Sequence, residues 1–119
     1  MAGKIAHFEV PADDTSRATR FYDELFGWQL QRMEGPVEYY MGDAGGTTVG
    51  LHSNADSGGI PGLFVYFDVD DIDDGISRVK QLGGQAEDRS PVPGMGWFSR
   101  CTDTEGNPFG LWQADRSVS

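Results

Sequence analysis

Cysteine and long apolar runs are scarce in this chain of 119 residues. The single cysteine, Cys101, cannot form an internal disulfide, which fits a reducing compartment. No apolar run approaches the roughly 20 residues of a membrane span. The amino-terminal residues reach His7 and Glu9 too soon for the apolar stretch of a signal peptide. We therefore expect a cytoplasmic protein.

Basic residues are also few: nine Lys and Arg stand against nineteen Asp and Glu, for a net charge of −10. Phosphate backbones and anionic membrane surfaces both require clustered cations, and the chain has only two lysines. We therefore expect neither nucleic acid nor a membrane as a partner. A hydrophobic share of 38% is too high for a disordered acidic tail. The length suits a single domain over residues 1–119 with a proper core.

Two segments have the pattern of helices. In residues 13–26, Ala18, Tyr22 and Leu25 fall at helical spacing, between an aspartate pair that can cap the start and Gly27 at the end. Residues 71–82 repeat the pattern, with an apolar face that includes Ile72 and Ile76, and stop at two glycines. Strands are expected at 4–10, 28–33, 37–42, 47–52, 62–69, 85–88, 95–102 and 108–113.

The predicted order, strand, helix and three strands, occurs twice. Residues 7–10 (HFEV) match 66–69 (YFDV) at an offset of 59, and residues 49–52 (VGLH) match 109–112 (FGLW) at an offset of 60. This indicates a duplicated unit that must pack on its copy to bury a sheet face. Repeat one covers about 4–53, a Gly-rich linker 54–61, and repeat two about 62–114. We predict an α+β fold: two βαβββ repeats forming a curved mixed sheet around a cleft, with the helices on the outer face.

Strand alternation divides the predicted sheet into two faces. One is uniformly apolar and should pack under the helices. The other mixes polar, aromatic and small side chains, which suits a ligand-binding surface better than a core. We predict that this second face, with a nearby aromatic, binds the ligand through His7, Gly50, His52, Phe64, Tyr66, Trp97, Gly110 and Trp112.

Three longer segments carry a family resemblance: HFEVPADD at 7–14, FYDELFGW at 21–28 and DTEGNPFGLW at 103–112. With these motifs the chain resembles the vicinal oxygen chelate superfamily, which includes glyoxalases, bleomycin resistance proteins and extradiol dioxygenases. The resemblance extends over residues 7–113 and is strongest to the short glyoxalase-like branch. It implies the duplicated fold described above, and a homodimer.

Metal enzymes of this superfamily hold their ion with His or Glu from the first and last strand of each repeat. Carried over by position, those ligands fall at Ile5, Gly50, Phe64 and Gly110, and none of these side chains binds a metal. We therefore expect no metal and no other cofactor, and interpret the chain as a small-molecule-binding protein. A displaced divalent metal site built on His7 and His52 is the alternative for the cofactor.

Other functions stay open at this point. As an enzyme, the chain would be a lyase or dioxygenase with displaced metal ligands, or a metal-free isomerase with His7 or Glu9 as the base. The resemblance also includes proteins that sequester antibiotics, where an acidic protein would attract a cationic drug. Aromatic side chains such as Tyr39 and Trp97 could stack on a planar ligand or simply pack in the core. Cys101 is interpreted as a structural thiol.

Overall fold

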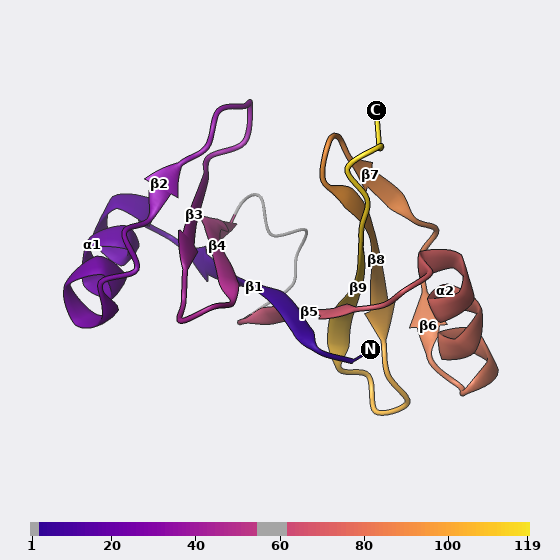
Figure 1. Cartoon of the computed structure of the whole chain (residues 1–119). Helices are drawn as coiled ribbons and strands as arrows, with labels where there is room; N and C mark the ends of the chain where they lie inside the picture. Colours follow the sequence, from indigo (N-terminus) through magenta and orange to yellow (C-terminus); the bar gives the residue numbers. More distant parts are fainter. Residues whose placement is uncertain (1–2, 55–61) are drawn as a thin grey trace. The chain divides into compact units, whose positions relative to one another are not determined.

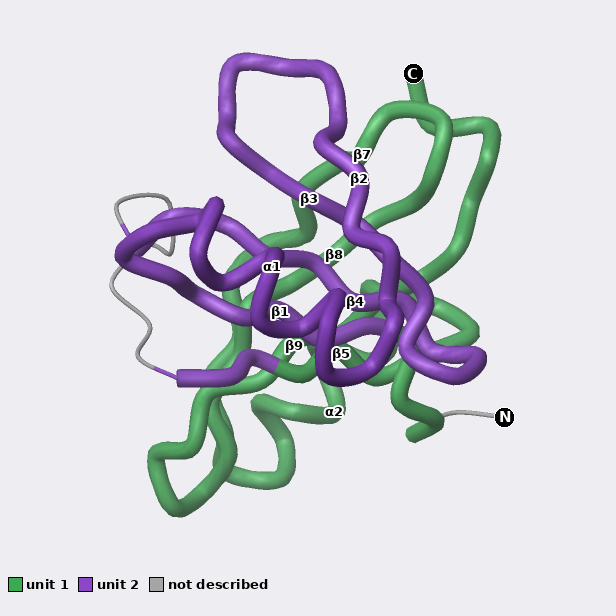
Figure 2. Tube along the Cα trace, turned by 90° about the vertical axis from the view of Figure 1, so that its left-hand side faces the viewer, with its two compact units in different colours: residues 1–6, 65–119 green, residues 7–64 purple. Residues whose placement is uncertain are grey.

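The computed structural model describes residues 3–54 and 62–119 and divides the chain into two compact units. Unit 2 contains His7–Phe64, and unit 1 contains Met1–Ala6 and Val65–Ser119 (Figures 1 and 2). Most of the predicted linker, residues 55–61, lies outside the described part. Among the described residues, no helix is long and apolar enough to cross a membrane.

Unit 2 is the first βαβββ repeat (Figure 1). Its elements are β1 (Ile5–Ala12), α1 (Thr15–Phe26), β2 (Gln31–Arg32), β3 (Tyr39–Asp43) and β4 (Thr48–Ser53). The strands lie in the order β2-β3-β4-β1, with β1 parallel to β4 and the other pairs antiparallel. Asp14 caps α1 by accepting a hydrogen bond from the Arg17 N–H, and Gly27 ends it in the left-handed conformation (φ 72°).

Unit 1 repeats this order with one addition. Its elements are β5 (Phe64–Asp68), α2 (Ile72–Gln81), β6 (Gln85–Ala86), β7 (Ser90–Val92), β8 (Gly96–Thr102) and β9 (Pro108–Ala114). The strands lie in the order β5-β9-β8-β6, and β7 pairs with β8. At its amino end, the backbone of Gly3 and Lys4 bonds to Asp68 at the end of β5, so β1 begins in unit 1 and continues in unit 2. Two βαβββ repeats with two helices confirm the predicted α+β class; the cleft stays a prediction.

Each unit has its own core on the helix-facing side of its strands. In unit 2 the buried cluster consists of Val10, Ala12, Leu30, Val49 and Leu51, with Ala18 and Tyr22 of α1 packed against it. In unit 1 it consists of Ile72, Ile76, Cys101 and Leu111. The core residues that lie on strands alternate with the residues of the mixed face, as the sequence pattern predicts. The mixed face is therefore opposite the core in both units.

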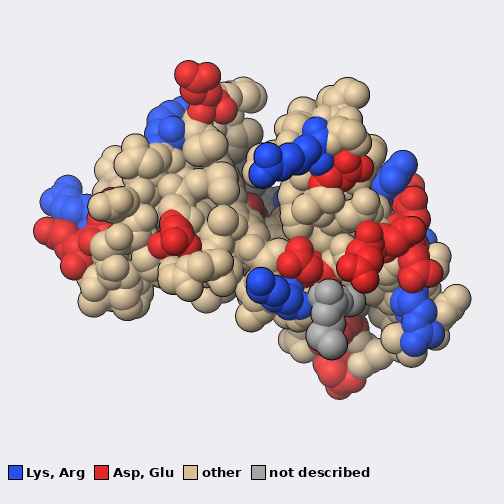
Figure 3. Space-filling model, in the orientation of Figure 1, with Lys and Arg blue, Asp and Glu red and all other residues tan. Residues whose placement is uncertain are grey.

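Acidic side chains gather on the surface over α2 (Figure 3). Asp73 and Asp74 lie in the first turn of this helix, and Arg78 and Lys80 in its last. This distribution complements the helix dipole. One aspartate also pairs across the surface, since Asp73 Oδ2 lies 3.4 Å from Arg89 Nη1. The aspartates of this helix therefore have structural reasons that do not involve a ligand.

Candidate functional site

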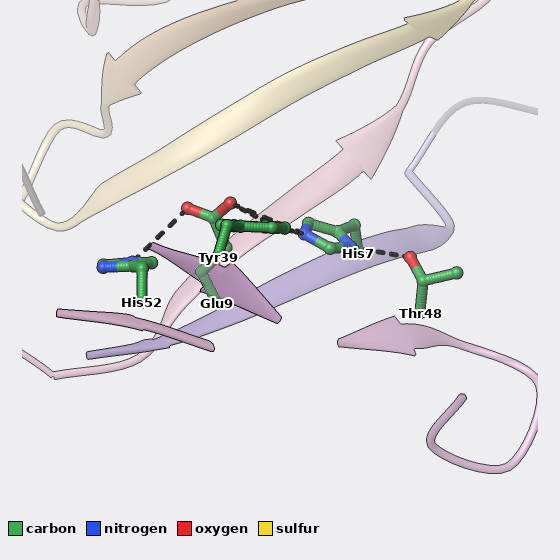
Figure 4. Close-up of polar contacts among 5 residues, drawn as sticks. All are labelled: His7, Glu9, Tyr39, Thr48 and His52. Atoms are coloured by element: carbon green, nitrogen blue, oxygen red, sulfur yellow. Dashed lines mark hydrogen bonds and ion pairs between the residues drawn. The ribbon is translucent and has the colours of Figure 1, made fainter. Parts of the chain in front are cut away.

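The mixed face of unit 2 carries a cluster of five polar side chains. His7 and Glu9 come from β1, Tyr39 from β3, and Thr48 and His52 from β4. Figure 4 shows the Glu9 carboxylate between His52 on one side and His7 on the other, with Thr48 beyond His7. On β1, His7 and Glu9 alternate with Phe8 and Val10, which pack in the core. Strand alternation therefore places the cluster on one face.

A chain of hydrogen bonds connects four of these side chains. Thr48 Oγ1 lies 2.6 Å from His7 Nδ1, His7 Nε2 lies 2.8 Å from the Tyr39 hydroxyl, and that hydroxyl donates to Glu9 Oε2 at 2.9 Å. Because the single hydroxyl hydrogen of Tyr39 goes to Glu9, its oxygen accepts from His7 Nε2–H. In a neutral imidazole, Nδ1 then accepts from Thr48. The carboxylate, which only accepts, thus sets the donor-to-acceptor order of all these hydrogen bonds.

His52 approaches the same carboxylate from the other side. Its Nε2 lies 3.8 Å from Glu9 Oε1, and its Nδ1 lies 3.0 Å from the backbone carbonyl of Ser53. The imidazole is stacked parallel to the Tyr39 ring, with the ring centroids 6.3 Å apart. His52 is one of the few buried polar residues of the described chain, at 5% exposure. The structure therefore brings His7 and His52 together around Glu9.

Glu9 is held as a carboxylate. Its partial burial alone would raise its pKa, but hydrogen bonds from the His7 imidazole and the Tyr39 hydroxyl, with the charge that His7 and His52 carry when protonated, outweigh burial and lower the pKa below its ordinary value. A carboxylate with a lowered pKa keeps its charge and accepts a proton poorly at neutral pH. The site therefore offers a fixed negative charge.

Tyr39 is central to the cluster but is not among the binding residues predicted from the sequence. The sequence allowed its ring to stack on a planar ligand or to pack in the core, whereas in the structure its hydroxyl joins His7 to Glu9. Tyr39 on β3 pairs directly with His52 on β4, and the Tyr39 ring extends over Gly50. A tyrosine on one strand and a histidine on its neighbour are a weak signal of a shared site, because the pairing of the two strands has to be known first.

The predicted binding residues of unit 1 divide between two faces. Tyr66 pairs with Gly110 and Asp68 with Trp112, so Tyr66, Gly110 and Trp112 share the mixed face. Phe98, opposite Trp112 on β8, meets the Tyr66 ring edge-on at 6.2 Å. Tyr66 and Gly110 are buried, and Trp112 is half-buried.

One predicted residue, Trp97, lies apart from that group. Trp97 is on the opposite face, against the core cluster under α2, and Arg89 lies over its ring at 3.9 Å. The structure therefore does not place Trp97 beside Trp112, because neighbouring residues of a strand alternate between faces. Phe64, the last residue of unit 2, is buried at the start of β5, where alternation puts it on the same face as Tyr66. The binding role of these residues stays a prediction.

The positions expected to be equivalent in the two repeats differ in strand register. The sequence match pairs Glu9 with Asp68, and Gly50 with Gly110. In the structure, Gly50 lies beside Glu9, whereas Gly110 lies beside Tyr66. The parallel pair of unit 1 is thus shifted by two residues, which keeps every side chain on its face but changes its neighbour.

The residues at the family's metal positions do not fit a metal ion. Ile5, Gly50, Phe64 and Gly110 offer no ligand atoms from their side chains. The space beside Gly50 is filled by the Tyr39 ring and hydroxyl. Over residues 3–54 and 62–119, no group of three His, Cys, Asp or Glu is placed to hold a metal. The displaced site on His7 and His52 stays an untested alternative.

The sequence matches the profile of the Glyoxalase/Bleomycin resistance protein/Dioxygenase superfamily over residues 4–111. CFP32 of Mycobacterium tuberculosis and of Mycobacterium bovis, provisionally named a glyoxylase, is 32% identical over 120 residues. This match covers 92% of the chain and 45% of the relative, so the chain spans about half the length of that relative. A glyoxylase-like domain-containing protein of Didymella fabae is 28% identical over 126 residues, covering 93% of this chain and 94% of that protein.

Solved structures with the same fold are more distant in sequence. A hypothetical protein from Bacillus halodurans aligns over 98% of both chains with a TM-score of 0.78 and 15% identity. Methylmalonyl-CoA epimerase from Mycobacterium tuberculosis aligns over 94% of this chain and 88% of its own, with a TM-score of 0.74 and 14% identity. At these identities the similarity is one of fold.

Proposed function

The chain belongs to the glyoxalase, bleomycin resistance protein and dioxygenase superfamily, and we propose that it binds a small organic molecule through the polar cluster of unit 2. In this proposal the hydrogen-bonded side chains of His7, Glu9, Tyr39 and His52 take the role that a metal ion has in other members. The ligand is bound by hydrogen bonds and charge.

The observation that carries the proposal is the ordered hydrogen-bond chain from Thr48 through His7 and Tyr39 to Glu9. Four polar side chains from three strands are joined by hydrogen bonds with one donor-to-acceptor order, on the face opposite the core. Fixing each side chain costs conformational freedom, and the neighbours that lower the pKa of Glu9 keep its carboxylate charged at this place. Such preorganised groups on a sheet face are typical of ligand sites.

The lowered pKa of Glu9 favours binding over base catalysis. An efficient general base has a pKa near the working pH, and enzymes usually raise the pKa of a carboxyl group to reach it. Here the neighbours act in the opposite direction. We therefore propose that Glu9 contributes its charge to the ligand and does not abstract a proton.

The homodimer implied by the family resemblance is part of the proposal. One chain has a mass of 13.0 kDa, so light scattering on the eluting protein should give 2 × 13.0 = 26.0 kDa. A mass of 13.0 kDa at micromolar concentration would contradict this part alone. It would leave the binding site in unit 2 unaffected.

Tyr39→Phe tests the function, and Tyr40→Phe is its matched control. Tyr39 belongs to the cluster, whereas Tyr40 packs against the core on the opposite face of the same strand. Both variants remove a single hydroxyl. In a thermal-shift screen of small amines, alcohols and carboxylates, compounds that stabilise the wild type should lose their effect on Tyr39→Phe and keep it on Tyr40→Phe.

Two outcomes would overturn the proposal. Stabilising compounds could act equally on both variants, which would place their site elsewhere. Alternatively, protein purified without chelator could contain one divalent metal per chain that is lost on mutation of His7 or His52, which would support the metal-dependent alternative.

A further inference from the structure

Resting on the proposed function, we infer that the gap between the Glu9 carboxylate and the His52 imidazole is the subsite for the ammonium group of an amine ligand. This assigns a chemical class to the ligand. The argument depends on which atoms at the gap carry hydrogen, on the distance between them, and on the charge of the protein.

The hydrogen positions follow from the partners. His52 Nδ1 lies 3.0 Å from the Ser53 carbonyl, which only accepts, so Nδ1 carries the hydrogen. A neutral His52 therefore presents a lone pair at Nε2. On the other side of the gap, Glu9 Oε2 already accepts from Tyr39, whereas Oε1 faces His52 Nε2. Two acceptors thus face each other.

The distance between the two atoms is compatible with a group that bridges them. A protonated His52 donating directly to the carboxylate would bring the two atoms to about 2.8 Å. They lie 3.8 Å apart, beyond a hydrogen bond. A nitrogen atom placed about 2.9 Å from each acceptor would see them about 80° apart, which lets two of its hydrogens point to one acceptor each.

This geometry discriminates between chemical classes. An ammonium group supplies two hydrogens and the positive charge that the Glu9 carboxylate requires. A hydroxyl has one hydrogen and satisfies one acceptor. A carboxylate ligand would add a third acceptor, and a quaternary ammonium has no hydrogen to donate.

The rest of the molecule is consistent with a cationic ligand. The net charge of −10 produces a negative potential that attracts cations. His52 is almost fully buried, while 19% of the Glu9 side chain is exposed, so the ligand would reach the gap along the carboxylate.

The test uses four probes that share a phenyl ring: benzylamine, benzyl alcohol, benzoate and benzyltrimethylammonium. Binding is followed through the imidazole nitrogen resonances of His52 in protein with ¹⁵N-labelled histidine. Benzylamine should shift Nε2, and the other three should bind at least tenfold more weakly. Glu9→Gln, whose amide can donate across the gap to His52, should weaken benzylamine at least tenfold. Glu24→Gln, the same change on the exposed face of α1, should leave its affinity unchanged.

A second variant covers the case in which Glu9→Gln fails to fold. His52→Phe keeps an aromatic ring beside Tyr39 and removes Nε2, and it should also weaken benzylamine. Benzyltrimethylammonium or benzoate could bind as tightly as benzylamine and lose this binding in Tyr39→Phe. That result would overturn the amine assignment and leave the proposed function standing. No response of His52 to any probe would overturn the amine assignment, and no response of His7 either would also count against the proposed function. Zinc ion alone, binding once per chain and displacing benzylamine, would assign the gap to a metal.

Discussion

Gly50 and Tyr39 occupy the same space on neighbouring strands: a β-carbon on Gly50 would overlap the hydroxyl oxygen and the ring of Tyr39. The glycine lies in a regular strand, where its backbone could carry any side chain, so the close approach of the ring is what requires it. The absence of a side chain on β4 lets the ring of Tyr39 lie flat and place its hydroxyl between His7 and Glu9. One glycine thus positions the polar cluster.

Gly50→Ala should therefore displace Tyr39. We expect a loss of about 1–3 kcal/mol in the free energy of unfolding, as for other overpacked sites. Urea unfolding measures it. In a Tyr39→Ala background the same substitution should cost much less, because the overlap is gone, and the two mutations should be strongly non-additive. Equal costs in both backgrounds would mean that the Tyr39 ring is not the reason why position 50 requires glycine.

Glu9 should make the stability of the protein depend on pH. Its pKa in the folded state is below its ordinary value, so its contribution is present above that ordinary pKa and is lost as the pH falls through the lowered one. The difference in unfolding free energy between wild type and Glu9→Gln should therefore be larger at pH 7 than below about pH 4. Urea unfolding at a series of pH values measures this difference. With Glu24→Gln as the control, no comparable trend is expected, and a difference that grew on acidification would contradict the sign.

Local patterns predicted the helices and the two faces of the sheet because their causes are local. Asp14 and Gly27 lie at the ends of α1, as the sequence indicated. The alternation along β1 separates His7 and Glu9 from Phe8 and Val10, as expected. The duplication was visible because both repeats retain the same order of elements.

The remaining features depend on contacts that a pattern does not contain. The strand expected at 28–33 is reduced to Gln31–Arg32, because Gln29 has a left-handed backbone (φ 56°) and Leu30 enters the core. β7 was missed because it is short and contains Pro91, which disfavours a strand in the interior of a sheet. The role of Tyr39 depends on the pairing of β3 with β4, which places it opposite His52.

Gln113 should stabilise α2 from a neighbouring strand. Its side-chain oxygen accepts a hydrogen bond of 2.8 Å from the Ile72 N–H, in the first turn of the helix, where backbone N–H groups lack helical partners. Gln113→Ala should therefore cost about 1 kcal/mol in the free energy of unfolding. Chemical denaturation measures it. The control is Gln81→Ala at the exposed end of the same helix, which should cost less; equal costs would contradict a capping role for Gln113.

Cys101 should react slowly while the protein is folded. Its side chain is packed in the core cluster of unit 1, and burial raises the pKa of the thiol, despite a contact of 3.6 Å with the Ser99 hydroxyl. The thiolate is the reactive form, so both its low population and its burial oppose modification. With a disulfide reagent at pH 8, the native protein should react much more slowly than protein in urea, where one thiol per chain should react at the rate of a free cysteine. The slow native rate should increase in variants that open unit 1, such as Gln113→Ala, because the thiol becomes accessible only through unfolding. A native rate equal to the rate in urea would mean that Cys101 is an accessible thiol and would contradict its place in the core.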